Sequence, residues 1–159
     1  MSVGIQPSIG GNLTQVASSA AAARQLVVCA LGSEQYGLPI EQVREIVRYA
    51  APRPVASELP WMRGVIGLRG RLVPVHDLAV RMDLAPTAPI PPTAKLVILE
   101  ADGELAAVLV DDVVEVLHVE QAQLEPVPSG SGWIARVDER LVLLLDAHEL
   151  LAEPCAASS

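Results

Sequence analysis

Residues 62–78 read MRGVIGLRGRLVPVHDL, which is the most informative stretch of the chain. Two short strand-forming runs, VI at 65–66 and LVPV at 72–75, flank a turn with the sequence LRGR. Gly70 can take the positive φ that a tight hairpin requires, so the stretch predicts two antiparallel strands with Arg69 held at the tip. A guanidinium fork on a rigid hairpin is more typical of docking than of catalysis.

The hairpin belongs to one of two copies of a pattern along the chain. At an offset of 70 residues, Glu45 falls on Glu115 and residues 26–28 fall on 96–98; at an offset of 69, residues 71–73 fall on 140–142. Each copy reads as strand, turn, strand, connector and strand, followed by a hairpin that ends in Asp. Two copies predict a pair of pseudo-symmetric lobes rather than a solenoid, which needs at least three repeats.

Strand signals within each copy are separated by Gly, Pro or Asp turns, which indicates a small barrel or sandwich. The eight residues 85–92 contain four prolines and are predicted to form a semi-rigid linker. Helix signals are few. Ser57 is predicted to begin a short capped turn, and residues 146–151 a terminal helix with Asp146 as N-cap and Glu149 at the capping-box position. The sequence therefore predicts a mostly β fold with a few short helices.

Charge and hydropathy exclude two classes of function. The chain is 51% hydrophobic, yet no apolar run approaches the ~20 residues of a membrane span. Residues 24–83 carry eight arginines against six acidic residues, whereas residues 95–153 carry three basic against thirteen acidic residues. Neither half has a basic stripe with interleaved aromatics, so we expect no nucleic-acid binding. The asymmetry suits a protein that meets different partners on different sides, or an acidic surface that serves solubility.

The cysteines and the first residues indicate a cytoplasmic protein. Cys29 and Cys155 have neither disulfide-framework nor metal-ligand spacing. The first 23 residues carry no charge and lack the positive segment of a signal peptide. We expect residues 1–24 and 153–159 to be disordered or frayed tails.

No catalytic constellation emerges from the side chains. Asp111 and Asp112 follow a strand like the acidic pair of receiver domains, but the only lysine lies upstream of them and no βαβ alternation is present. Turning the chain is the favoured role of this pair. The three histidines lie in separate elements without ligand spacing. We predict no catalytic residue, no metal site and no cofactor.

Binding therefore remains the function to test. Arg69 is either simply solvated at the hairpin tip or held in place by a partner. Glu45 follows a strand-like run in the same copy, and we hypothesise a Glu45–Arg69 ion pair that fixes the guanidinium.

Four motifs in the same order resemble those of the CheW-like coupling proteins of bacterial chemosensory systems. Residues 64–70 (GVIGLRG) resemble the family's "GVxNLRG", and residues 73–78 (VPVHDL) its "VPVxDL". Residues 36–46 resemble "YGIxIxxVxEI", and residues 110–117 resemble "VDxVxEVL". Gly67 departs from the pattern, because the family usually has Asn there, whose amide can bond the turn backbone.

The resemblance implies two SH3-like, five-stranded β-barrel lobes packed pseudo-symmetrically around a shared core. We expect one domain at residues 25–152, with lobe one at about 25–84, the linker at 85–93 and lobe two at about 94–152. It also implies a non-enzymatic adaptor that couples a methyl-accepting chemoreceptor's cytoplasmic tip to the regulatory domain of a CheA-type histidine kinase. Such a protein would be cytoplasmic and recruited to membrane receptor arrays, without inserting into the membrane itself.

The positions that carry the family's motifs give the predicted binding residues, which are Glu45, Ile46, Leu68, Arg69, Gly70 and Val110. Three alternatives remain open on the sequence. They are an adaptor of the same fold for pilus motility or another non-flagellar pathway, a small β-barrel enzyme, and an oligomeric structural protein.

Overall fold

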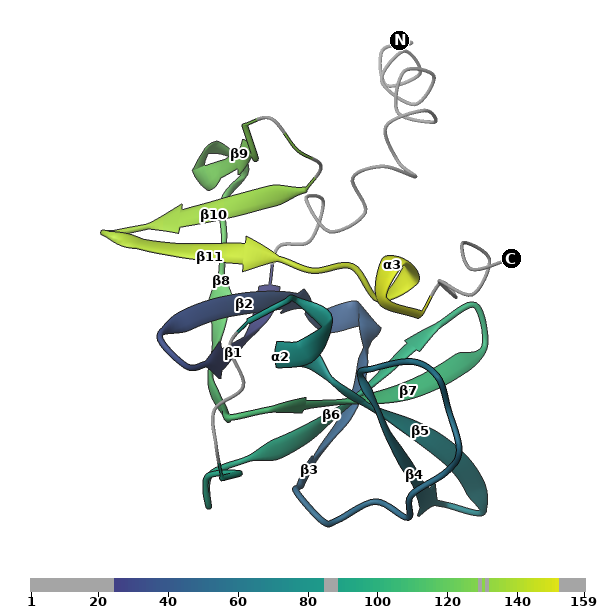
Figure 1. Ribbon diagram of the computed structural model, residues 1–159. Helices are drawn as coiled ribbons and strands as arrows, with labels where there is room; N and C mark the ends of the chain where they lie inside the picture. Colours follow the sequence, from purple (N-terminus) through teal and green to yellow (C-terminus); the bar gives the residue numbers. More distant parts are fainter. Residues whose placement is uncertain (1–24, 85–88, 129, 131, 152–159) are drawn as a thin grey trace, which may run out of the picture.

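The computed structural model describes residues 25–84, 89–128, 130 and 132–151, which form two β-sheets packed together (Figure 1). Both predicted tails and residues 85–88 of the predicted linker lie outside the described residues. The prediction of a mostly β fold with a few short helices is confirmed.

The first sheet has six strands in the order β8-β1-β2-β11-β10-β9. Its strands are β1 (Gln25–Leu31), β2 (Glu34–Pro39), β8 (Asp112–His118), β9 (Leu124–Pro126), β10 (Trp133–Val137) and β11 (Arg140–Leu144). All neighbours are antiparallel except β2 and β11, which run parallel with Leu143 opposite Tyr36.

The second sheet has five strands in the order β3-β6-β7-β5-β4. Its strands are β3 (Val43–Arg48), β4 (Met62–Leu68), β5 (Arg71–Asp77), β6 (Lys95–Ala101) and β7 (Glu104–Val110). Again a single pair is parallel, β5 with β7, in which Val75 lies opposite Ala107. The parallel pair occupies the equivalent place in each sheet, which agrees with the sequence repeat.

The contiguous lobes expected at residues 25–84 and 94–152 need correction, because each sheet takes strands from both halves of the chain. The β1–β2 hairpin of the first half lies between β8 and β11, and the β6–β7 hairpin of the second half lies between β3 and β5. The first sheet also has six strands where five were expected, β9 being only three residues long. A repeat in sequence shows which strands are equivalent but not which copy they pair with.

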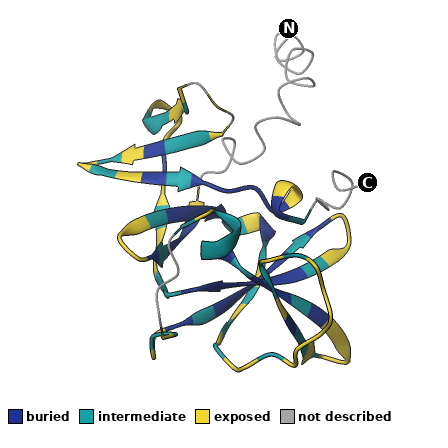
Figure 2. Cartoon of the chain, in the orientation of Figure 1, coloured by how far each residue is buried: buried dark blue, intermediate teal, exposed yellow. Residues whose placement is uncertain are grey.

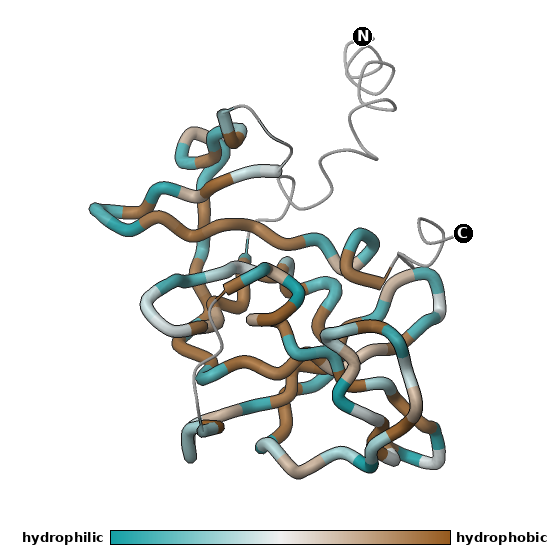
Figure 3. The backbone as a smooth tube through the Cα atoms, viewed as in Figure 1, coloured by the Kyte–Doolittle hydropathy of each residue, from teal (hydrophilic) through white to brown (hydrophobic). Residues whose placement is uncertain are grey.

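The shared hydrophobic core lies between the sheets. It joins residues of β1, β2, β6 and β7 to the short helices α2 (Leu78–Arg81) and α3 (Ala147–Leu151), which lie where the sheets meet (Figure 1). Each sheet also has a smaller hydrophobic cluster of its own. Buried residues occupy the middles of the strands and exposed ones the hairpin tips (Figure 2), and hydrophobic runs follow β6 and β11 (Figure 3).

Both predicted local caps are present. Asp146 accepts a hydrogen bond from the backbone N–H of His148 at 2.9 Å at the start of α3. The Ser57 hydroxyl accepts one from the N–H of Leu59 at 3.1 Å, before a turn that leads into β4. Two 3-10 turns complete the described elements, η1 (Ile40–Gln42) and η2 (Gln121–Gln123). None of the described helices has the length and apolar character needed to cross a membrane.

Candidate protein-docking surface

The hairpin of β4 and β5 turns on two residues, Arg69 and Gly70. Their φ angles are 53° and 80°, so both lie in the left-handed region. Two consecutive positive φ angles are the mark of a type I′ turn, whose twist matches that of the flanking strands. The sequence predicted this geometry at Gly70; Arg69 also adopts it, although residues with a Cβ seldom do.

The hypothesised Glu45–Arg69 ion pair is confirmed. Arg69 Nη2 donates to both carboxylate oxygens of Glu45, at 3.1 and 3.0 Å, and Nε donates to Oε1 at 3.3 Å. The Arg69 side chain is 74% exposed, whereas that of Glu45 is 28% exposed. Exposed ion pairs contribute at most about 1 kcal/mol to stability. The main consequence of the pair is that the guanidinium is held in one orientation on the surface.

The other predicted binding residues of this hairpin and of β3 do not share one surface. Leu68 is half-buried and lines a pocket together with Glu45 and Arg69. Gly70 is exposed with open space around its Cα. Ile46 is exposed on β3 but follows Glu45 on the opposite face of the strand, so it is not part of this pocket.

Val110 was predicted to contribute to binding, and the structure corrects this. Its side chain is 0% exposed and belongs to the core between the sheets. It ends β7, which lies inside the second sheet between β6 and β5 and is covered on both sides. Val110 therefore supports the fold and cannot itself contact a partner.

Gly67 also has a different role from the one its motif position suggested. It lies within β4 opposite Leu72, outside the turn, and its φ is not in the left-handed region. A Cβ at this position would meet nothing within 4 Å. Gly67 is therefore not one of the two turn residues, and the type I′ turn forms at Arg69 and Gly70 without an Asn side chain beside it.

The second sheet's ion pair has a counterpart in the first sheet. Glu115 on β8 pairs with Arg140 on β11, with Oε2 and Nη2 2.7 Å apart. The repeat equates Glu115 with Glu45, but Arg140 corresponds to Arg71, not to Arg69. The same kind of bridge is thus made with an arginine after the turn in one sheet and within the turn in the other. Arg140 is not among the residues predicted from the sequence, although the offset of 69 residues that equates it with Arg71 was a signal for it.

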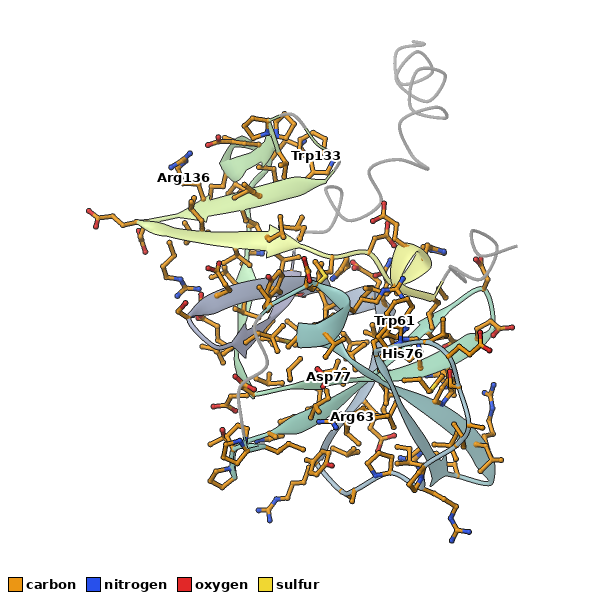
Figure 4. The ribbon with its side chains drawn as sticks, viewed as in Figure 1. Trp61, Arg63, His76, Asp77, Trp133 and Arg136 are labelled. Carbon is orange, nitrogen blue, oxygen red and sulfur yellow. The ribbon has the colours of Figure 1, made fainter. Side chains whose placement is uncertain are left out.

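Asp77 and its neighbours form ionic and aromatic contacts that hold the end of β5 in place (Figure 4). Asp77 accepts a hydrogen bond from the N–H of Val80 as the N-cap of α2, and its other oxygen lies 3.2 Å from Nε of Arg63. The guanidinium of Arg81 lies 4.5 Å from the ring centre of Trp61. These groups hold strand, helix and turn together.

The remaining chemical candidates serve the fold. Asp111 accepts a hydrogen bond from the N–H of Gly32 at 2.8 Å, and Asp112 accepts one from the N–H of Val113. Both bonds agree with a chain-turning role for this acidic pair. Burial, with a smaller contribution from the charge of Asp112, raises the pKa of the Cys29 thiol to about 12, so it is not a nucleophile at neutral pH. Within the described ranges, no group of three or more His, Cys, Asp or Glu side chains could hold a metal ion.

Comparison with known proteins agrees with this architecture. The family model of the CheW-like domain matches residues 25–155. The chain is 30% identical over 140 residues to the probable chemotaxis protein CheW of Rhizobium etli, covering 82% of this chain and 88% of that protein. It is 26% identical over 143 residues to the chemotaxis protein CheW of Bacillus subtilis, covering 85% and 91%.

A solved structure shares the fold. The crystal structure of the scaffolding protein TtCheW from Thermoanaerobacter tengcongensis superposes with a TM-score of 0.71 and 28% sequence identity, covering 77% of this chain and 83% of that one. The described strands, the two-sheet arrangement and the family match over most of the length lead to one conclusion: the chain belongs to the CheW-like family.

Proposed function

We propose that this chain is a non-enzymatic adaptor that couples the cytoplasmic tip of a methyl-accepting chemoreceptor to the regulatory domain of a CheA-type histidine kinase. Its relatives are named as chemotaxis and scaffolding proteins, and they match along most of its length. In this role the protein acts in the cytoplasm, recruited to receptor arrays at the membrane.

The observation that carries the proposal is the Arg69 guanidinium, fixed by Glu45 on a rigid type I′ hairpin and 74% exposed. A fixed, exposed fork has little conformational entropy left to lose when it meets a carboxylate or carbonyl oxygen of a partner. Gly70 beside it leaves room for the partner's backbone to approach.

An adaptor regulates by geometry. It changes kinase activity by holding receptor and kinase in a defined arrangement, which is a coupling free energy between two binding sites. That requires a stiff body between the sites, and the shared core between the two sheets supplies it.

Reconstitution tests the proposal. A receptor cytoplasmic fragment and a CheA-type kinase are mixed with and without the full chain, and kinase autophosphorylation and co-sedimentation are measured. We expect a ternary complex and a change in autophosphorylation that depends on the chain. Absence of both would refute the coupling function, and turnover of a substrate by the chain alone would refute the non-enzymatic assignment.

A further inference from the structure

A pocket of about 300 Å³ opens beside the Glu45–Arg69 pair, where β3, β6 and β7 meet the tip of the β4–β5 hairpin. Its floor is apolar and belongs to the core of the second sheet. Ile98 is fully buried there, and Leu68 and Leu105 are half-buried beside it. An apolar floor reached from solvent is a place where a partner side chain can be desolvated.

The rim of the pocket is cationic. Three arginines line it, Arg44, Arg69 and Arg71, with Glu45 as the one acidic lining residue. Arg69 is engaged by Glu45, and Arg44 forms an ion pair with Glu100. Arg71 makes no ion pair within the part of the chain that the structure describes. The rim therefore has one guanidinium whose charge is not balanced by a neighbouring carboxylate.

We infer that this pocket receives a protein segment that carries a carboxylate beside a large aliphatic side chain. The carboxylate pairs with Arg71, and the aliphatic side chain rests on Leu68 and Leu105. This inference rests on the proposed function and adds the chemistry of the partner's contact. A protein segment fits better than a small anion, because a small anion would pair with Arg71 but leave the apolar floor of Leu68, Ile98 and Leu105 uncovered.

The test compares Arg71 with Arg48, an exposed arginine on the same sheet that lies outside the pocket. The full chain is prepared as wild type, Arg71→Ala, Arg71→Glu and Arg48→Glu, and affinities for the receptor fragment and for the kinase are measured separately at two salt concentrations. We expect Arg71→Glu to weaken binding to one of the two partners by about tenfold or more and Arg71→Ala by less. Arg48→Glu should leave both affinities within about twofold, and Arg71→Ala should reduce the salt dependence.

The apolar half of the contact needs its own variant. Leu105→Ala should weaken the same partner as Arg71→Glu, with the folded state verified by thermal denaturation. If that variant does not fold, the reduced salt dependence of Arg71→Ala still tests the contact between Arg71 and the partner's carboxylate. A scan that replaces each glutamate of the partner by lysine then identifies that carboxylate as the one whose replacement restores binding to Arg71→Glu.

Each remaining outcome has one meaning. If wild type binds both partners and Arg71→Glu behaves like Arg48→Glu, the pocket assignment is wrong while the coupling function stands. If wild type binds neither partner, the proposed function fails and the pocket assignment fails with it. If Arg71→Glu abolishes self-association and leaves both partner affinities unchanged, the occupant is a second copy of this chain and the inference is overturned.

Discussion

Arg69 is an exposed side chain that we expect to matter for assembly and little for stability. Its ion pair with Glu45 is bidentate but solvated. We expect Arg69→Ala to change the free energy of unfolding by less than about 1 kcal/mol. Because the oriented fork is lost, the same variant should reduce co-sedimentation with receptor and kinase.

The matched control for Arg69 is Arg136, which forms a similar exposed pair with Glu125 on β9, at 2.7 Å between Nε and Oε2. Arg136→Ala removes a fork of the same chemistry from the other sheet. It should alter stability by a similar amount and leave assembly unchanged. Equal assembly by wild type and Arg69→Ala would contradict the role given to Arg69.

Two glycines of β4 should respond in opposite ways to substitution by alanine. Gly64 has a φ of +138°, and a Cβ there would lie 2.2 Å from the carbonyl oxygen of Arg53. That contact exists because Arg53 and Val65 exchange two backbone hydrogen bonds, at 2.8 and 2.9 Å, across the edge of β4. Gly64→Ala should therefore destabilise the fold by about 2–4 kcal/mol in urea unfolding.

Gly67 serves as the control for Gly64, since it lies in the same strand with open space around it. Gly67→Ala should be neutral or stabilise by up to about 1 kcal/mol, because glycine within a strand is entropically costly. Similar effects of the two substitutions would show that the close approach of Arg53 does not matter.

Among the elements, a buried amide connects the turn η1 to the start of the helix α3, which lie far apart in the chain. Nε2 of Gln42 in η1 donates to Oδ1 of Asp146 at 3.0 Å, and Oε1 of Gln42 accepts the N–H of Ala147 at 2.8 Å. The N–H of His148 also bonds Asp146 Oδ1. The Gln42 side chain thus supplies hydrogen-bond partners to the first residue of α3 and to its N-cap, although it belongs to a different element.

Replacing Gln42 by Leu should cost about 2–3 kcal/mol, because a buried backbone N–H loses its acceptor. Equilibrium unfolding in urea measures this, with Gln121→Leu in the exposed turn η2 as control. Equal stability of the two variants would mean that water replaces the lost contacts.

At the scale of the whole molecule, the exchange of hairpins between the halves predicts a single cooperative unit. Trp61 directly precedes β4 and its ring lies against Arg81 of α2, whereas Trp133 begins β10, so each sheet has a fluorophore at a strand start (Figure 4). Single-tryptophan proteins made by Trp61→Phe and Trp133→Phe should report the same urea midpoint, after correction for any stability change measured by circular dichroism. Two separate transitions would show that the sheets unfold independently.

The buried thiol of Cys29 should make the free energy of unfolding depend on pH in the alkaline range. Burial and then the charge of Asp112 raise the pKa of Cys29 from 9.0 to about 12. Between pH 9 and about 12 the Cys29 thiol ionises only in the unfolded chain. The contribution of the neutral thiol to the free energy of unfolding is therefore complete below pH 9 and falls as pH rises toward 12. The slope attributable to this group reaches at most ~1.4 kcal/mol per pH unit.

Cys29→Ala lacks this ionisation and should show a shallower loss of stability above pH 9, despite a lower stability at neutral pH from the smaller side chain. Tyr36, whose pKa is raised first by burial and then by Glu34, contributes in the same direction and is present in both proteins. Parallel pH profiles of the two proteins would exclude ionisation of Cys29 as the cause.

The mostly β character, the repeat and the hairpin that presents Arg69 could be predicted from the sequence, because these depend on local patterns of residues. The sequence also predicted the Glu45–Arg69 pair, since both lie in the same copy of the repeat. The sequence did not predict that β1–β2 and β6–β7 lie among strands of the other half, or that Val110 is buried. Pairing between distant strands depends on which arrangement buries both faces of each hairpin, and no local signal specifies it. For the same reason the cationic pocket around Arg71 became visible only when five strands were brought together.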